Sequence, residues 1–270
     1  MHILITGSNG FLGKETTLAL KKNYKLTFLG RKKVRNKNYI FCDLNDTEKL
    51  NKILEHLKPD VVINLAAEVN FKKKTKSMYM VNTLCPYVIA KFCKKNNAHL
   101  IHASGTIING IKSIYNIKTK HDPINAYGKS KLEAELLIKK INCRYSIIRF
   151  GGIFGKNGPE HLSINRFIKH ALRGKNLNFN GNIKSIRNYI FVKDAARFIK
   201  SCVKNKLIGT FYAGGEKQSF KQMLLKINLI LGKNTLINFK DTNEARQDQL
   251  IISDKKIKIT SFKKSLMTII

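Results

Sequence analysis

The feature that most constrains this chain lies at its start, where a short apolar run leads directly into regularly spaced glycines. Residues 2–6 read HILIT and predict a strand, and TGSNGFLG at residues 6–13 carries a glycine at every third position before a segment with helical spacing. A glycine turn between a strand and a helix allows the backbone to approach a pyrophosphate, which the positive helix N-terminus stabilises. The loop therefore predicts a dinucleotide site. The residues expected to contact the dinucleotide are Gly7, Asn9, Gly10, Phe11, Leu12 and Gly13.

The end of the second predicted strand distinguishes between two dinucleotides. A carboxylate at this place would hold the ribose 2′-hydroxyl of NAD, whereas a nearby arginine accommodates the 2′-phosphate of NADP. The chain reads FLGRKK here and has no carboxylate, so Arg31 and Lys32 are placed for a phosphate. We therefore favour NADP(H) and keep NAD(H) open, because basic residues are common throughout the chain.

Length and composition restrict the class of protein. The 270 residues, 43% of them apolar, allow one large domain or two domains that share a core. The longest apolar runs, such as VVINLAA, fall far short of the roughly 20 residues of a membrane span. The first strand begins almost at the N-terminus and leaves no room for a secretory signal. We expect a soluble cytoplasmic protein without a membrane span.

The strong positive charge has two explanations. The 51 lysines and arginines exceed the 17 acidic residues by 34, and nucleic-acid binders use such side chains to contact phosphates. The basic residues, however, are spread evenly and form no arm or tail. Lysine, asparagine and isoleucine are all abundant and share AT-rich codons, so a bias of composition explains the charge better than a nucleic-acid partner does. An RNA-associated basic protein remains an alternative.

Neither the cysteines nor the histidines predict a metal site. The five cysteines are far apart, form no Cys-x-x-Cys pair and are odd in number, which favours buried reduced thiols. The seven histidines form no cluster with ligand spacing, and we interpret His161 and His170 as structural or surface residues. We therefore predict no metal.

Apolar runs alternate with amphipathic segments through the first 150 residues. Strands are expected at residues 2–6, 25–29, 39–44, 59–67, 99–104 and 143–151, and helices at 11–22, 46–58, 78–96 and 127–141. Strands alternating with helices imply a parallel sheet covered on both faces. We expect an α/β fold in which residues 1–150 form a Rossmann-type doubly wound NAD(P)-binding domain, with its sheet completed by residues near 186–202. Residues 151–270 are expected to form a smaller, mainly substrate-binding region.

Several motifs come in one order and at one spacing along almost the whole chain. They are TGSNGFLG, CDL at 42–44, NLAA at 64–67, Asn82, HASGTIING at 102–110, YGKSK at 127–131, RFGGIFG at 149–155, RNYIFVKDAA at 187–196 and FYAGG at 211–215. As an ordered set they resemble the extended short-chain dehydrogenase/reductases, the NAD-dependent epimerase/dehydratase family that modifies nucleotide sugars. The resemblance implies a Rossmann fold, a nicotinamide cofactor and a nucleotide-sugar substrate.

The resemblance also assigns roles to residues. It makes Tyr127 the catalytic acid or base and Lys131 its partner, and a helix would present two residues four apart on one face. A free tyrosine titrates near pH ~10, and a neighbouring ammonium lowers that pKa by stabilising the phenolate. The Arg246 segment is one residue shorter than the family's R-x-G-D pattern. The further residues implied are Asp43, Leu44, Leu65, Ala66, Ala67 and Asn82 for the cofactor, and Arg187 and Arg246 for substrate phosphate.

The chain departs from the family at the hydroxyl that hydrogen-bonds the substrate oxygen. The family shows S-[ST]-x-x-V-Y-G, whereas this chain reads SGTIING and places Gly105 where the hydroxyl is expected. Ser104 and Thr106 flank Gly105, and we favour Thr106, which would also contact substrate. Thr106 and Ile107 stand where the family's dehydratases carry Asp-Glu. Because elimination needs an acid and a base within reach, we set dehydration aside.

Of the reactions that the family catalyses, reduction and epimerisation remain as candidates for this chain. The short chain, Asn64 within PDVVINLAA and the basic end of the second strand resemble dTDP-4-dehydrorhamnose reductases, while FYAGG and IISDKKIK resemble enzymes such as UDP-glucose 4-epimerase. We favour NADPH-dependent reduction of a nucleoside-diphosphate keto sugar in surface polysaccharide synthesis. An NAD-dependent 4-epimerase is the first alternative. A non-catalytic dinucleotide-binding protein, suggested by Gly105, is the second.

The predicted helices also bear on assembly. Residues 82–96 and 127–141 carry more apolar side chains than packing against one sheet face requires. By resemblance, these helices would pair with those of a second copy as a four-helix bundle. We therefore expect a homodimer.

Overall fold

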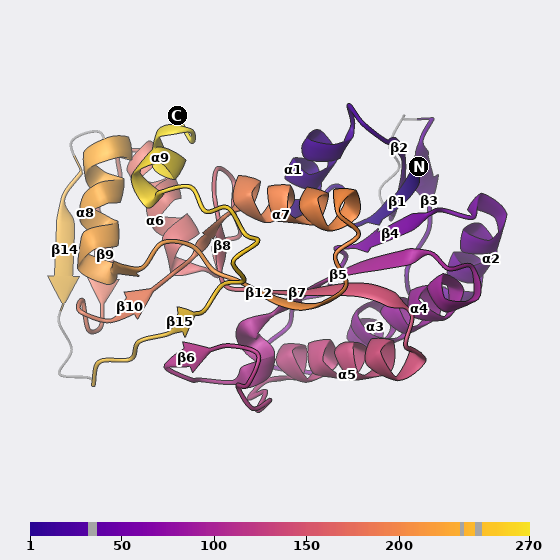
Figure 1. The fold of residues 1–270 in the computed structure, drawn as a ribbon. Helices are drawn as coiled ribbons and strands as arrows, with labels where there is room; N and C mark the ends of the chain where they lie inside the picture. The colour runs from indigo at the N-terminus through magenta and orange to yellow at the C-terminus, as the bar shows by residue number, and fades with distance from the viewer. Residues whose placement is uncertain (32–36, 233–234, 241–244) are drawn as a thin grey trace. The chain divides into compact units, whose positions relative to one another are not determined.

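A computed structural model of the protein describes residues 1–31, 37–232, 235–240 and 245–270. The chain divides into two compact units (Figure 1). The first contains residues 1–110, 120–149 and 196–211, and the second contains residues 111–119, 150–195 and 212–270. Because the chain passes between the units several times, each unit combines segments that are distant in sequence.

A seven-stranded sheet with the order β12-β7-β5-β4-β1-β2-β3 forms the centre of the first unit. Its strands are β1 (His2–Thr6), β2 (Lys25–Gly30), β3 (Tyr39–Phe41), β4 (Val61–Asn64), β5 (His99–Gly105), β7 (Arg144–Phe150) and β12 (Gly209–Ala213). The pairs β3–β2, β2–β1, β1–β4 and β4–β5 are parallel. The strand order reverses direction between β1 and β4. In doubly wound folds, ligands bind beyond the carboxyl ends of the strands at this place.

Helices cover both faces of this sheet (Figure 1). They are α1 (Phe11–Leu20), α2 (Thr47–Leu57), α3 (Lys76–Tyr79), the π-helical turn η1 (Met80–Leu84), α4 (Cys85–Lys95), the 3₁₀ turn η2 (Thr106–Asn109), α5 (Ala126–Ile141) and α7 (Val192–Lys204). The helices α2, α4 and α5 lie on one face, and α1 and α7 lie on the other. All four residues of β4 are buried, as expected of a central strand covered on both sides.

The start and end of α5 follow from local sequence. Asn125 caps the helix, because its side chain accepts a hydrogen bond from the backbone N–H of Gly128 at 2.8 Å. The helix ends at Asn142, which adopts the left-handed conformation at φ 53°. The Asn125 cap therefore fixes Tyr127 in the first turn of α5 and Lys131 one turn later.

The structure confirms the α/β doubly wound fold predicted from sequence and differs in two details. The strand that completes the sheet is β12 at residues 209–213, whereas residues 186–202 contain two short strands and most of α7. The helix expected at residues 78–96 is interrupted by the π-helical turn η1.

All five cysteines are buried. No helix in the described part of the chain is long and apolar enough to cross a membrane.

The described part of the second unit contains short strand pairs and several helices. The elements are β6 (Ile114–Tyr115), β8 (Ile153–Phe154), α6 (Ser163–Leu172), β9 (Leu177–Asn180), β10 (Ile186–Arg187), β11 (Ile190–Phe191), β13 (Gln218–Ser219), α8 (Phe220–Leu231), β14 (Ile237–Lys240), β15 (Leu250–Ile251) and α9 (Phe262–Met267). The strand pairs are β8–β11, β9–β14, β10–β13 and β6–β15. Phenylalanine rings fill part of the interior; for example, Phe179 and Phe220 lie 4.7 Å apart between centroids.

Candidate functional site

The glycine loop between β1 and α1 is shaped for close approach of backbone. Gly7 has φ 69°, and a Cβ added to it would lie 2.7 Å from the backbone nitrogen of Ala66. A Cβ on Gly13 would overlap the carbonyl oxygen of Gly7. Gly10 occupies the N-cap of α1, and no side chain among the described residues caps the first turn. The first backbone N–H groups of α1 therefore remain able to bind an anion.

Replacing Gly7 with alanine tests whether this loop binds a dinucleotide. The new methyl group meets Ala66 and the positive φ is strained, so we expect NAD(P)H affinity to fall by more than about tenfold and stability to fall by about 1 kcal/mol or more. Gly209→Ala is the matched control, because Gly209 also has a positive φ, 123°, but no atom lies within 4 Å of the place that its new methyl group would take. Unchanged nucleotide affinity in Gly7→Ala would exclude the loop as the site.

The other residues expected to bind cofactor have varied surroundings. Arg31 follows β2 and is exposed, and it makes no ion pair with a residue that the structure describes. Lys32 lies outside the described residues. The Oδ1 atom of Asp43 accepts hydrogen bonds from the backbone and side chain of Asn45 at 3.0 and 2.9 Å. Leu44 is buried in the core.

The carboxyl end of β4 faces the glycine loop. Leu65 and Ala66 are half-buried and Ala67 is exposed. The backbone N–H of Ala66 donates to the hydroxyl of Thr6 at 3.3 Å, which ties the end of β4 to that of β1. The segment predicted from NLAA therefore adjoins the loop predicted from TGSNGFLG. Asn9 of that loop reaches the hydroxyl of Tyr39 at 3.4 Å.

Tyr127 and Lys131 lie in different environments along α5. Tyr127 is half-buried, with its ring edge-on to that of Phe71 at 5.9 Å between centroids, and burial raises the pKa of its hydroxyl to about 12. Lys131 is buried and donates a hydrogen bond to the carbonyl oxygen of Ala103 at 2.6 Å. Burial lowers the pKa of Lys131 to about 8, although Glu135 and Cys85 act in the opposite direction. The tyrosine is therefore a phenol at neutral pH and the lysine is mostly charged.

A buried chain of polar side chains leads from β1 to Lys131. The Thr6 hydroxyl donates to Oδ1 of Asn64 at 2.6 Å, and Nδ2 of Asn64 lies 3.1 Å from Nδ1 of His102. Nε2 of His102 lies 3.4 Å from Nζ of Lys131. Burial and the charge of Lys131 hold the pKa of His102 well below its usual value. The neutral imidazole packs beside Lys131 and helps to fix its position.

Sequence reasoning did not single out His102. The available signal was a polar residue, Asn64, at the end of the apolar strand VVIN, and a histidine, His102, in the interior of the neighbouring strand HLIHAS. Because adjacent parallel strands bring Asn64 and His102 into register, the two polar positions form one contact. A buried polar residue needs a partner, so this pairing could be inferred from strand order.

Asn82 connects the segment after β4 to α5. Its side-chain amide accepts from the backbone N–H of Glu68 and donates to the carbonyl oxygen of Glu68, both at 2.8 Å. It also donates to the hydroxyl of Ser130 at 3.0 Å. Ser130 in turn donates to the carbonyl oxygen of Tyr127 at 2.8 Å. Asn82 lies in the π-helical turn η1, a local distortion that is often found near functional sites.

The two candidate hydroxyls next to Gly105 differ in their availability. Ser104 is buried and donates to Oε1 of Glu135 at 2.6 Å. Thr106 is half-buried at the start of η2, and within the described part of the chain its hydroxyl has no hydrogen-bond partner. The Ser104 hydroxyl is therefore already engaged in a hydrogen bond to Glu135, whereas the Thr106 hydroxyl makes none with the described residues.

A buried ion pair lies behind Ser104. Arg149 of β7 donates through Nη2 to Oε2 of Glu135 at 2.6 Å, and Nε lies 3.1 Å from both carboxylate oxygens. Both side chains are almost completely inaccessible. Nη2 of Arg149 also lies 2.9 Å from Nε2 of His121. This cluster connects β5, α5, β7 and the loop before α5.

The two arginines expected to bind phosphate come together in the second unit. Arg187 of β10 lies 5.3 Å from the ring centroid of Phe220 and bonds to the carbonyl oxygen of Ile186 at 2.9 Å. Arg246 forms a two-pronged pair with Asp248, with its shortest contact at 2.8 Å. Asp248 also accepts from the backbone N–H of Ile186 at 2.8 Å, so it links the two segments. Arg246 is thus neutralised locally by Asp248.

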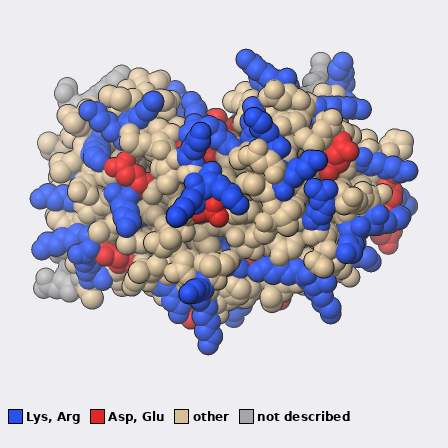
Figure 2. Space-filling view, in the orientation of Figure 1, with Lys and Arg blue, Asp and Glu red and all other residues tan. Residues whose placement is uncertain are grey.

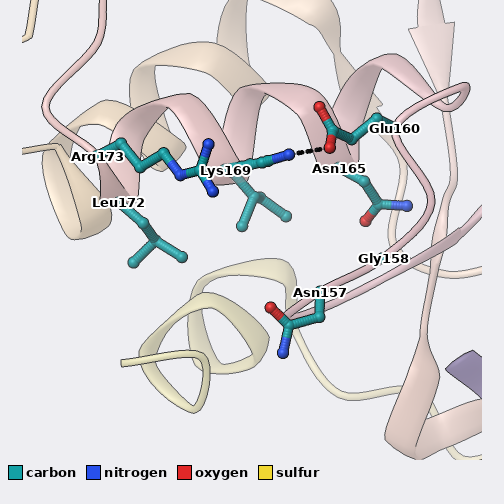
Figure 3. A pocket seen from close by; sticks show the side chains of 8 residues that line it. Asn157, Gly158, Glu160, Asn165, Lys169, Leu172 and Arg173 are labelled. Carbon is teal, nitrogen blue, oxygen red and sulfur yellow. Dashed lines mark hydrogen bonds and ion pairs between the residues drawn. The ribbon is translucent and has the colours of Figure 1, made fainter.

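The second unit also contains a pocket that sequence reasoning did not predict (Figure 3). Its lining comes from the loop after β8 and from α6, and consists of Asn157, Gly158, Glu160, Asn165, Ile168, Lys169, Leu172 and Arg173. Glu160 pairs with Lys169 across it. Asn165 bonds to Gly155, Ile153 and Pro159 and so holds the loop in place. Three of the polar side chains, Glu160, Lys169 and Asn165, therefore have structural partners.

Positive charge is scattered rather than concentrated. Figure 2 shows lysine and arginine side chains over the whole visible face of both units, interspersed with few acidic ones. On this face the scatter matches the even distribution along the sequence and shows no continuous basic track for a nucleic acid. Among the described residues, no group of three or more His, Cys, Asp or Glu side chains could hold a metal.

The sheet order, the glycine loop and the Tyr-Lys pair on α5 define a Rossmann-fold protein of the extended short-chain dehydrogenase/reductase class. The RmlD substrate binding domain family matches residues 1–222, and the chain belongs to this family. The sequence-based resemblance to the extended class is confirmed.

Two curated relatives illustrate the range of the family. The chain is 30% identical over 177 residues to a dTDP-4-dehydrorhamnose reductase from Aggregatibacter actinomycetemcomitans, covering 64% of this chain and 56% of the relative. It is 29% identical over 249 residues to a dTDP-D-glucose 4,6-dehydratase from Dictyostelium discoideum, covering 78% and 57%. The chain thus matches little more than half the length of these relatives.

Solved structures share the fold over their whole length. A dTDP-4-dehydrorhamnose reductase from Bacillus anthracis in complex with NADP has a TM-score of 0.80 at 19% identity, with coverage of 99% of this chain and 98% of that one. A UDP-glucuronic acid 4-epimerase from Bacillus cereus in complex with NAD has a TM-score of 0.83 at 24% identity, with coverage of 99% and 96%. At these identities the likeness establishes the fold.

Proposed function

We propose that the protein is an NADPH-dependent reductase of a nucleoside-diphosphate keto sugar. The observation that carries the proposal is the placement of Tyr127 and Lys131 one turn apart on α5, in a chain that belongs to the RmlD substrate binding domain family. Reduction of a carbonyl requires a proton donor, and the Tyr127 hydroxyl, whose pKa burial raises, can supply that proton.

The glycine loop fits a dinucleotide. The close contacts of Gly7 and Gly13 and the uncapped start of α1 form a backbone cradle that a pyrophosphate would fill. Arg31 would contact the 2′-phosphate, and Lys131 would contact the nicotinamide ribose. A bound nicotinamide dinucleotide supplies the hydride that carbonyl reduction requires.

The residues of the chain would act on the substrate oxygen. Tyr127 donates its hydroxyl proton to the carbonyl oxygen as the carbon is reduced, so that the carbonyl becomes an alcohol and the tyrosine becomes a phenolate. Thr106 donates a hydrogen bond to the same oxygen, because the Ser104 hydroxyl is committed to Glu135. Lys131 stabilises the phenolate electrostatically. Residues 151–270 would bind the nucleotide sugar, with Arg187 at its phosphates.

Restoring the family hydroxyl at position 105 should raise the rate. Gly105 has φ −150° and ψ 158°, an extended conformation that any residue adopts, so threonine fits the backbone. If Gly105 marks a lost donor, Gly105→Thr increases kcat for keto-sugar reduction by about 10-fold to 100-fold. Thr106→Val is the companion variant and is expected to lower kcat by a similar factor. A loss of activity in Gly105→Thr with no effect of Thr106→Val would contradict the assignment of Thr106.

The pH dependence of the reduction rate should reflect the loss of the proton from the Lys131 ammonium. Its lowered pKa of about 8 means that the ammonium is charged below this pH and neutral above it. We expect kcat/KM for keto-sugar reduction to fall as the pH rises through about 8, while Tyr127 stays protonated. Steady-state rates across this range provide the measurement. A rate that stays constant well above pH 8 would show that the charge of Lys131 is not needed.

A nucleotide-sugar 4-epimerase is the second candidate. The segments FYAGG and IISDKKIK favour it, and such an enzyme would retain NAD through each turnover. Protein denatured after purification would then release one NAD per chain. The reductase hypothesis instead predicts an exchangeable NADPH.

We also propose a homodimer that forms through η1, α4 and α5, since Leu136 on α5 is 53% exposed. Light scattering of the purified protein would test this assembly.

A further inference from the structure

We propose that the surface formed by β6, β15 and the turn after β6 is a docking site for membranes with anionic lipid headgroups. Three isoleucines define this surface, which we name the isoleucine ridge: Ile114, Ile117 and Ile252, with exposed fractions of 51%, 65% and 51%. All three belong to the second unit. The proposal is independent of the reaction that the protein catalyses.

The pairing of β6 with β15 directs these side chains outward. The two strands are parallel, with Ile114 opposite Leu250 and Tyr115 opposite Ile251. Tyr115 and Ile251 are buried against Tyr212. Because successive side chains along a strand point to opposite faces, Ile114 faces away from this small core. The same alternation turns Ile252 outward, just beyond the end of β15.

The turn after β6 presents a third isoleucine. The backbone N–H of Asn116 donates to the hydroxyl of Thr119 at 2.8 Å, and the N–H of Thr119 donates to the carbonyl oxygen of Asn116 at 3.0 Å. These bonds close a tight turn with Ile117 near its tip. A branched apolar side chain in this position loses contact with water only if another surface covers it.

The charge around the ridge complements an anionic headgroup layer. Residues 111–119 contain two lysines and no acidic residue, and residues 250–259 contain three lysines and one aspartate. Lysines near an anionic membrane each contribute about 1 kcal/mol, and apolar side chains that enter the headgroup region add to this. Lysines occur all over the protein, so the isoleucines are what distinguishes this surface from the rest.

Vesicle binding provides the test. We would sediment the full-length protein with vesicles of phosphatidylcholine alone and of phosphatidylcholine mixed with phosphatidylglycerol, at low and physiological salt. We expect about tenfold or more binding to the anionic vesicles, weakened by salt. The double variant Ile114→Ser/Ile117→Ser should bind at least about tenfold less. Leu229→Ser, a change at an 82% exposed leucine on α8, is the matched control and should bind like the unchanged protein.

Three results would overturn the proposal. One is the absence of binding to anionic vesicles. Another is equal binding by the double variant, since charge alone would then explain the association. The third is a dimer of the unchanged protein that the double variant dissociates, with no vesicle binding, because a second copy would then cover the ridge. The single variant Ile117→Ser repeats the comparison at the turn, should the double variant unfold.

Discussion

Tyr127→Phe is expected to lower kcat for keto-sugar reduction by roughly 10²-fold to 10⁴-fold. The substitution removes one hydroxyl group and keeps the ring, so its edge-on contact with Phe71 persists. Ser130 bonds to the carbonyl oxygen of Tyr127 rather than to its side chain, so the first turn of α5 also persists. We therefore expect NADPH affinity and the unfolding midpoint to stay close to those of the unchanged protein.

The control for this variant is Tyr79→Phe. Tyr79 ends α3, is 37% exposed, and lies beneath Nζ of Lys74 at 5.2 Å, a contact that phenylalanine can also make. It should leave kcat unchanged. Full turnover in Tyr127→Phe would contradict the proposed proton donor. Dinucleotide binding without turnover in the unchanged protein would instead favour the non-catalytic alternative.

Glu135→Ala is expected to destabilise the protein by about 3–5 kcal/mol. The variant leaves the guanidinium of Arg149 buried, with His121 but without its carboxylate, and it removes the acceptor of the Ser104 hydroxyl. An unpaired buried charge costs much more than an ion pair at the surface contributes. Denaturant unfolding of the full chain measures the loss.

Glu133→Ala provides the matched control on the same helix. Glu133 pairs with Lys74 at 3.3 Å, and both side chains are more than 40% exposed, so its removal should cost about 1 kcal/mol or less. The double variant Glu135→Leu/Arg149→Met removes both buried charges and should recover part of the stability lost in Glu135→Ala. Equal effects of Glu135→Ala and Glu133→Ala would contradict the account of the buried pair.

The first half of the fold was predictable because its signals are local. HILIT, the glycines and the helical spacing after them each fix a short stretch of backbone, and together they require β1, a tight turn and α1. The Asn125 cap likewise determines where α5 begins. These signals depend only on residues that are close together in the sequence, so they can be recognised in one amino-acid sequence.

The remaining features depend on residues that are far apart in sequence. The hydrogen bond from Ser104 to Glu135 requires β5 and α5 to be packed together, and the two residues are 31 positions apart in the sequence. The link from Asn64 to His102 needs the pairing of β4 with β5. The completing strand β12 lies later than expected because short apolar runs after residue 150 fit several pairings equally well.

The π-helical turn η1 had no sequence signal. MYMVNTLCPYVIAKFCKKN reads as one helix with ordinary spacing, and the Pro86 in the first turn of α4 is compatible with a helix start. The extra residue in the turn is stabilised by tertiary contacts of Asn82 with Glu68 and Ser130. Such contacts override local preference and appear only in the folded chain.

The measurement that tests the central proposal most directly is cofactor exchange during turnover. The purified protein is first denatured to identify any bound dinucleotide, and NADPH or NADH oxidation is then followed with nucleoside-diphosphate 4-keto sugars as substrates. The account predicts no retained NAD, and stoichiometric oxidation of NADPH in preference to NADH. Retained NAD together with interconversion of two sugar epimers, without net NADPH oxidation, would contradict it.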